Sequence, residues 1–172
     1  MTNNRASRFV VLLVAFVMTT LGVAALVGSQ FDQNFVRDQL IAQKIQFGPA
    51  ETLPDQFKQY AGAQVDSGSM AKEYAGLIQV HVYTATGGKS YSEVSKAAAE
   101  AAKGSDKAEA AKMADLKRTA LDGQLLRGTL LNAYGWSLVG TIAAVAGFAL
   151  LAVSAVLFVL SIVLVLQAPV RE

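Results

Sequence analysis

The sequence contains no cysteine and only one histidine among its 172 residues. Without cysteine the chain can form no disulfide, thiolate nucleophile or cysteine-based zinc cluster, and it has no lipobox thiol to carry an acyl anchor. The single imidazole, His81, is a poor basis for a metal site, and we expect it to be partly buried on a packed helix face. The folded parts of the chain must therefore be held together by side-chain packing.

Charge is also scarce, because only 16% of the residues are charged, against roughly 25% in a soluble domain. Hydrophobic residues make up 53% of the chain. This composition is typical of a membrane protein. The 15 Lys and Arg and the 13 Asp and Glu are scattered along the sequence, so no nucleic-acid-binding surface is indicated.

Two long uncharged segments organise the chain. Residues 136–166 exceed the roughly 20 residues that a membrane-spanning helix needs. Residues 9–28 follow Arg5 and Arg8 and are longer than the roughly 7 to 15 apolar residues of a signal peptide, so we predict a retained span. The predicted fold class is an all-α membrane protein, in which two transmembrane helices extend into a small exported helical domain, residues 29–135.

The positions of the arginines predict the orientation. Arg5, Arg8 and Arg171 flank the inner ends of the two spans, whereas the outer ends carry only Asp32. Short arginine-bearing flanks remain cytoplasmic. We therefore expect residues 1–8 and 167–172 in the cytoplasm, the two spans in the plasma membrane and residues 29–135 outside.

The exported part reads as helical on both sides of a loop. The first span is expected to continue as a helix to about Lys44, followed by an irregular segment, residues 48–68, with one short helix at 54–60. Apolar residues at helical spacing predict a further helix over 70–82, with a strand over 78–86 as the second interpretation.

Two start signals predict the remaining helices. Ser90 and Glu93 form a capping-box pattern, which opens an alanine-rich helix to about Lys103. Asp106 gives a similar signal for a helix that continues into the second span. Small residues in the outer halves of both spans are candidates for close helix packing, whereas the bulky inner half, 150–166, suits lipid or a partner protein. The helix-packing candidates are Gly22, Gly28, Gly140, Ala144 and Gly147.

No pattern in the sequence indicates catalysis, a cofactor or a metal. Gly87-Gly88-Lys89-Ser90 resembles the end of a phosphate-binding loop, but Tyr83 stands where that loop requires glycine. Glu93, Glu100, Asp106 and Glu109 are explained as helix caps and solvated side chains. Neither predicted span contains an ionisable residue, which argues against transport. We therefore expect no enzyme activity.

Several segments resemble one family of proteins. Val36-Arg37-Asp38-Gln39-Leu40-Ile41-Ala42-Gln43-Lys44-Ile45, Tyr60-Ala61-Gly62, Ala71-Lys72-Glu73-Tyr74-Ala75, Tyr91-Ser92-Glu93-Val94 and above all Leu126-Arg127-Gly128-Thr129-Leu130-Leu131-Asn132-Ala133-Tyr134 are similar to an uncharacterised family of actinobacterial two-span envelope membrane proteins. The resemblance covers most of the chain and supplies no catalytic residues. Some small membrane proteins of this kind are accessory subunits of the cytochrome bcc–aa3 respiratory supercomplex, and the resemblance implies that role as one candidate.

The expected function is that of a non-catalytic accessory or assembly subunit. Its partners would be membrane lipids and a larger integral membrane protein complex, whose exported face the outer domain braces. The partner-contact candidates are Leu126, Arg127, Leu130, Tyr134, Trp136, Leu157 and Phe158. The alternative is a free-standing envelope protein that senses or binds a lipid or wall component.

Overall fold

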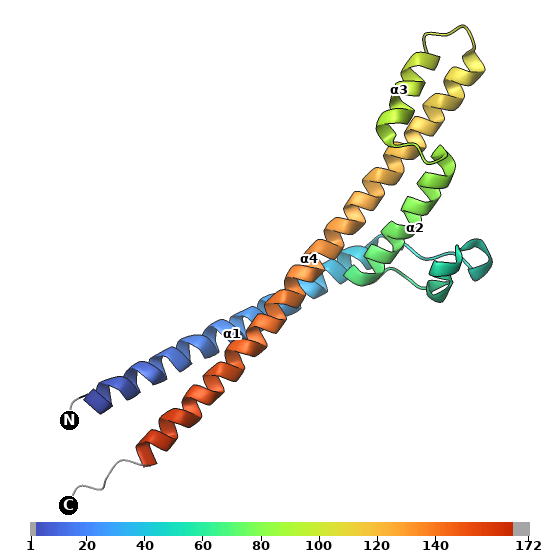
Figure 1. The fold of residues 1–172 in the computed structure, drawn as a ribbon. Helices are drawn as coiled ribbons and strands as arrows, with labels where there is room; N and C mark the ends of the chain where they lie inside the picture. The colour runs from blue at the N-terminus through green and yellow to red at the C-terminus, as the bar shows by residue number, and fades with distance from the viewer. Residues whose placement is uncertain (1–2, 167–172) are drawn as a thin grey trace, which may run out of the picture. The chain divides into compact units, whose positions relative to one another are not determined.

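A computed structural model describes residues 3–166 of the chain. No strand is formed within this range, where Gln46 and Gln64 make an isolated antiparallel bridge. The prediction of an all-helical fold is confirmed, and the strand interpretation of residues 78–86 is wrong. The elements in chain order (Figure 1) are α1 (Asn3–Ala42), the 3-10 helices η1 (Ala50–Thr52) and η2 (Asp55–Tyr60), α2 (Gly68–Thr86), α3 (Tyr91–Ala101) and α4 (Lys107–Leu166).

Two helices are long and apolar enough to cross a membrane. They are the segments Ser7–Ala42 of α1 and Lys107–Leu164 of α4. Only 11% and 17% of their most apolar windows are buried, whereas the core helix of a soluble protein would be mostly buried. Arg171 and the side chain of Arg5, which the predicted orientation uses, lie outside what the structure describes.

The chain divides into two compact units, which are described separately. The first, called here the helix-pair unit, comprises the described residues up to 34 and those from 138 onward. The second, called here the helical domain, is Phe35–Ser137. The predicted boundaries of the exported domain, 29 and 135, lie close to this division.

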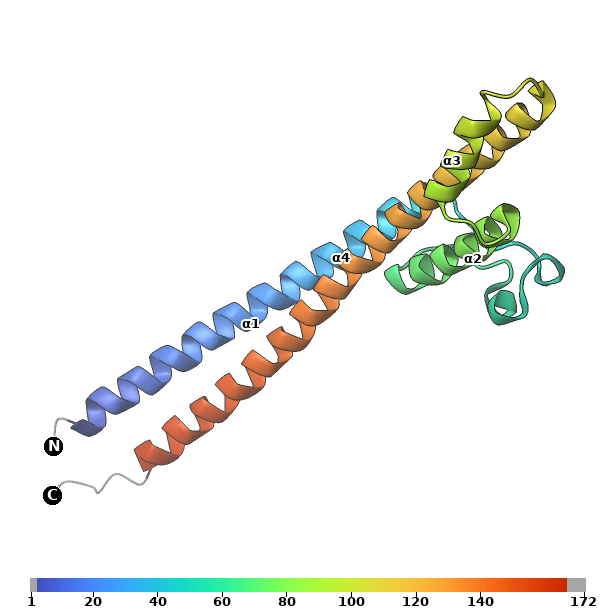
Figure 2. The same cartoon turned by 45° about the horizontal axis from the view of Figure 1, so that its top comes forward.

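Within the helix-pair unit, α1 and α4 run antiparallel in contact (Figures 1 and 2). The Arg8 guanidinium donates a hydrogen bond to the Leu164 carbonyl, and at the opposite end Gln33 Nε2 donates to Thr141 Oγ1 over 3.3 Å. Residues 8 to 33 of a helix extend about 37 Å at roughly 1.5 Å per residue. The paired length therefore exceeds the roughly 30 Å of a bilayer's hydrocarbon core.

The contact between the two helices centres on small buried residues at every seventh position, with Leu151 packed at Gly22 and Leu26 packed at Gly147. The buried positions are Ala15, Gly22 and Ser29 in α1, and Gly140, Gly147, Ser154 and Ser161 in α4. A strict seven-residue repeat keeps one seam of a helix facing its neighbour. Because these side chains are small, the two backbones approach closely.

Polar hydrogen bonds cross the same seam. The hydroxyls of Thr19 and Ser154 are 2.6 Å apart and hydrogen-bonded, and Ser154 Oγ also donates to the Ala15 carbonyl over 2.7 Å. Nearer one end of the pair, Asp32 Oδ2 is enclosed against Gly140 and has no hydrogen-bond partner among the described residues. The structure thus places the Asp32 carboxylate against Gly140, near the start of the predicted second span.

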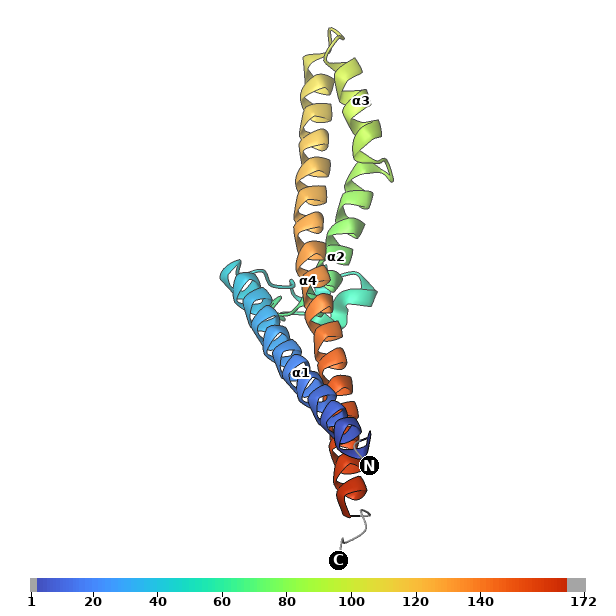
Figure 3. The ribbon, with the colours of Figure 1, turned by 90° about the vertical axis from the view of Figure 1, so that its left-hand side faces the viewer.

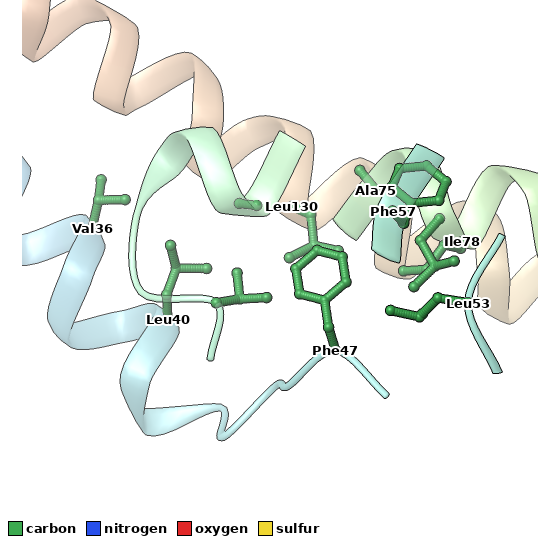
Figure 4. Close-up of a cluster of buried hydrophobic side chains, with 11 residues drawn as sticks. Val36, Leu40, Phe47, Leu53, Phe57, Ala75, Ile78 and Leu130 are labelled. Atoms are coloured by element: carbon green, nitrogen blue, oxygen red, sulfur yellow. The ribbon is translucent and has the colours of Figure 1, made fainter. Parts of the chain in front are cut away.

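The helical domain has a core of large apolar side chains (Figure 4). Phe47 lies near its centre, stacked on Tyr60 with 5.3 Å between ring centroids and edge-on to Tyr74 at 4.9 Å. The segments that contribute to this core are α1, the loop residues Phe47, Leu53 and Val65, η2, α2 and α4. Its buried members are Val36, Leu40, Phe47, Leu53, Phe57, Val65, Ala71, Ala75, Leu77, Ile78 and Leu130.

Helix α2 packs closely along the part of α4 that belongs to the helical domain (Figure 3). Its buried positions include Ala71, Ala75 and Ile78, and a Cβ atom added at Gly123 of α4 would collide with Val82. The expectation for His81 is wrong, because this side chain is exposed. Leu77 and Ile78, one helical turn before His81, are buried, so the buried stripe on this side of α2 ends before His81.

Local signals define the ends of these helices. Gly87 and Gly88, with φ of 60° and 82°, end α2 in the left-handed conformation that glycine adopts readily. The predicted capping box of α3 is confirmed: the Glu93 backbone N–H donates to Ser90 Oγ, and the Ser90 N–H donates to Glu93 Oε2 over 2.8 Å. Asp106 Oδ1 accepts from the N–H of Ala108 at the start of α4.

Candidate functional site

An exposed apolar surface lies on α4 within the helical domain. Leu125 and Trp136 are 61% and 57% exposed, and Leu121 and Leu126 are also exposed. Gly128 and Gly135 have no neighbouring atom within 4 Å of an added Cβ, so the helix backbone is open beside them. We call the four apolar side chains, Leu121, Leu125, Leu126 and Trp136, the α4 apolar surface.

Two of the predicted partner-contact residues do not belong to this surface. Leu130 is only 2% exposed and packs in the domain core, so its side chain serves the fold. Tyr134 is half-buried, and the Lys72 ammonium lies 5.3 Å from the centre of its ring, close enough for a cation–π contact. The side chains available to a partner are therefore Leu126 and Trp136 from the predicted set, with Leu121 and Leu125 beside them.

Arg127 lies in a pocket between three helices, which we call the cationic pocket. It has a volume of about 210 Å³ and is lined by residues near the end of α2, the start of α3 and the middle of α4. Its lining includes Gln79, Tyr83, Lys89, Glu93 and Arg127. Arg127 is half-buried and makes no hydrogen bond or ion pair within the described part of the chain.

The one carboxylate in the cationic pocket is already engaged. Glu93 Oε2 accepts hydrogen bonds from Ser90 Oγ over 2.7 Å and from the Ser90 backbone N–H. These bonds, from the side chain first and then the backbone, lower the pKa of Glu93, and the nearby Lys89 ammonium lowers it further. Glu93 is therefore an anion at neutral pH, and with Lys89 and Arg127 the pocket has one net positive charge.

A second pocket adjoins the first and is mainly apolar. We call it the apolar pocket; its volume is about 360 Å³, and Phe57, Gly76 and Val80 line it. Gln79 and Tyr83 line both pockets, which therefore meet at these two side chains. The Tyr83 side chain is 67% exposed, and a Cβ added at Gly88 would lie 3.1 Å from its ring.

The candidate residues in the helix-pair unit differ in their surroundings. Leu157 is half-buried and Phe158 is exposed. Their segment of α4 is not wholly free for lipid or a partner, because Ser154 and Ser161 on it are buried at the seam.

Among the predicted helix-packing residues, Gly22 and Gly147 lie face to face. A Cβ added at Gly22 would be 3.0 Å from the Gly147 carbonyl oxygen, and one added at Gly147 would be 2.9 Å from the Gly22 oxygen. Gly140 is buried against Asp32, and Ala144 is half-buried. Gly28 has open space at its Cβ position. The close approach therefore involves Gly22, Gly140 and Gly147 and leaves Gly28 outside it.

No group of three or more His, Cys, Asp or Glu side chains is placed to hold a metal ion in residues 3–166. Comparison with protein-family models, curated proteins and solved structures finds no match to this chain. The geometry itself must therefore carry the functional argument.

Sequence reasoning named Arg127 but did not find the pocket around it. Gln79, Tyr83 and Lys89 come from other parts of the sequence, and only the packing of α2 and α3 beside α4 brings them to Arg127. The one available signal was the pair of glycines at 87 and 88, which places Lys89 and Ser90 just beyond the end of α2.

Proposed function

We propose that this protein is a non-catalytic accessory or assembly subunit of a larger plasma-membrane complex. The observation that carries the proposal is the α4 apolar surface. Exposed leucines and a tryptophan grouped on one helix are characteristic of protein interaction sites, and tryptophan is among the residues that most often dominate binding energy. The open backbone at Gly128 and Gly135 would admit a partner side chain or helix closely.

The identity of the complex rests on the resemblance to the actinobacterial two-span family. On that ground the cytochrome bcc–aa3 supercomplex is the first complex to test. The proposed orientation, with both termini in the cytoplasm and the helical domain outside, rests on the flanking arginines. A reporter active only in the cytoplasm should work at either terminus and fail when inserted at Gly104, whereas the reverse result would overturn this orientation.

Co-purification in mild detergent tests the subunit proposal. The full-length chain should be recovered in fixed stoichiometry with a large membrane complex. Leu125→Ala combined with Trp136→Ala should reduce that recovery at least several-fold, because both side chains are exposed and neither supports the domain core. His81→Ala, which changes an exposed side chain on α2, is the matched control and should leave recovery unchanged.

Recovery of the protein alone, as a monomer or homo-oligomer, would contradict the proposal. It would favour a free-standing envelope protein that senses or binds a lipid or wall component. Equal recovery of the double variant and the parent would show that the complex binds a different surface.

A further inference from the structure

The two pockets of the helical domain offer different chemistry on the two sides of Gln79 and Tyr83. Gly76, Val80 and Tyr83 lie at helical spacing on α2 and line the apolar pocket. Tyr83 also lines the cationic pocket. A ligand that filled both would therefore need an apolar part and a polar part, joined beside the Tyr83 ring.

The cationic pocket is suited to an anion. Arg127 presents a planar guanidinium with five N–H donors, and no residue in the described structure accepts a hydrogen bond from it. Lys89 adds an ammonium group on the wall formed by the start of α3. Glu93 accepts hydrogen bonds from Ser90 and forms no ion pair with Arg127 in the described structure. Phosphate oxygens are strong acceptors with the geometry that a guanidinium recognises.

The apolar pocket is suited to an alkyl chain. Phe57 is buried in the core, and a Cβ added at Gly76 would come within 3.3 Å of its ring. The edge of the Phe57 ring therefore packs directly against Gly76, and both residues line the apolar pocket together with Val80. At about 360 Å³ the apolar pocket is at the lower end of the roughly 300 to 1,000 Å³ range of small-molecule sites, which suits one chain.

We propose that the helical domain binds a single-chain amphiphile with a phosphate head, the head at Arg127 and Lys89 in the cationic pocket and the alkyl chain in the apolar pocket lined by Phe57, Gly76 and Val80. Charge complementarity selects the ligand, because the pocket with the surplus positive charge shares Gln79 and Tyr83 with the apolar pocket. The site does not depend on the accessory-subunit proposal. Ligand binding can be measured on the chain alone, whereas the subunit proposal is tested by recovery of a partner complex. The failure of one proposal is therefore distinguishable from the failure of the other.

Photolabelling of the full-length chain tests this site. The protein is placed in nanodiscs of phosphatidylcholine, and the probe is monododecyl phosphate with a diazirine in its alkyl chain. The matching dodecyl alcohol serves as the neutral probe. Labelled peptides are mapped by mass spectrometry. Both probes should label the apolar helices of the helix-pair unit, and this labelling is the internal reference for the amount of probe present.

We expect the phosphate probe to label residues 76–83 about tenfold more than the alcohol, since one hydrogen bond to a charged group typically contributes at least that factor. Arg127→Gln should remove most of this difference. Arg118→Gln, on the same helix but exposed and paired with Asp122, should leave it unchanged. Gly76→Leu should reduce labelling at 76–83, because it places a large side chain in the wall of the apolar pocket beside the Phe57 ring.

Three results would overturn the site. They are equal labelling of residues 76–83 by the two probes, labelling that Arg127→Gln does not reduce, and no labelling of this segment by either probe. If Gly76→Leu disturbed the domain, hydrogen exchange in α2 would reveal it, and Lys89→Gln, at an exposed position, would then serve as the second variant. Lys89→Gln should lower labelling by the phosphate probe but not by the alcohol.

Discussion

The two units of this protein bury opposite kinds of side chain. At the seam of the helix-pair unit the buried residues are Ala, Gly and Ser, and large side chains such as Phe16 and Ile142 face outward. In the helical domain the buried residues include Phe47, Phe57 and Leu130. One chain therefore uses two different rules for packing helices.

The difference corresponds to the packing rules that hold in water and in lipid. In water, burying large apolar side chains is the main favourable term in folding. In lipid, large apolar side chains gain nothing from that term, so helices associate through close backbone approach and hydrogen bonds between hydroxyls. The Thr19–Ser154 hydrogen bond and the Gly22–Gly147 contact are features of the second kind. Small side chains buried at the seam and large side chains exposed around it thus support a membrane environment for the helix-pair unit.

Removing the central aromatic of the helical domain should give the largest effect. Phe47→Ala removes a 2% exposed ring together with its contacts to Tyr60 and Tyr74. The expected loss is about 3 to 5 kcal/mol. Hydrogen exchange of the full-length protein in nanodiscs should show lost protection in α2. Leu125→Ala, at an exposed position, is the control and should leave the protection of α2 unchanged. A comparable loss of protection in both variants would contradict the assignment of Phe47 to the core and Leu125 to the surface.

Separating the two helices of the helix-pair unit should give the next largest effect. Gly147→Leu places a side chain against the Gly22 carbonyl oxygen and the Leu26 side chain, and overpacking of this kind costs about 1 to 3 kcal/mol. Because the chain has no cysteine, Thr19→Cys with Ser154→Cys provides a clean crosslink across the seam. The crosslinking yield should fall several-fold with Gly147→Leu.

Gly28→Leu is the matched control for this experiment. It makes the same change at a glycine with open space at its Cβ position, so the yield should remain that of the parent. A similar fall in crosslinking yield with both variants would mean that any large side chain on these helices separates them, whether or not it lies at the seam.

Most of the fold could be predicted because its signals are local. The capping box at Ser90, the start signal at Asp106 and the glycines at 87 and 88 each act within one helical turn of their own position. The short helix predicted at 54–60 is the 3-10 helix η2. In these places neighbours along the sequence are also neighbours in space.

The seam between α1 and α4 could not be predicted in full because it depends on which faces meet. Small residues in both spans also occur at four-residue spacing, which offers several overlapping faces, Gly28 and Ala144 among them. The observed repeat of seven emerges only when Gly22 is placed opposite Gly147.

The candidate site was predicted only in part, for the same reason. Leu126 and Trp136 are recognisable as exposed apolar residues near the end of the domain, but Leu130 lies between them in sequence and points into the core. The partners of Arg127 in its pocket come from α2 and the start of α3. No pattern along one helix could have indicated them.

The smallest predicted effect concerns the start of α3, where the two units also differ. The helical domain caps this helix with the charged side chain of Glu93, whereas the described part of the helix-pair unit has no such cap. Hydrogen bonds from the Ser90 side chain and backbone, with a contribution from Lys89, hold the pKa of Glu93 below its ordinary value of 4.5. Folding therefore favours the ionised form. The resulting stabilisation of α3 is complete above pH 4.5 and is lost as the pH falls through the lowered pKa.

Hydrogen exchange of α3, corrected for the intrinsic rate at each pH, should show protection that decreases below pH 4.5. Glu93→Gln should abolish this step, and Glu100→Gln, in an exposed pair with Lys103, should retain it. A step that persists in Glu93→Gln would assign the acid sensitivity to another group.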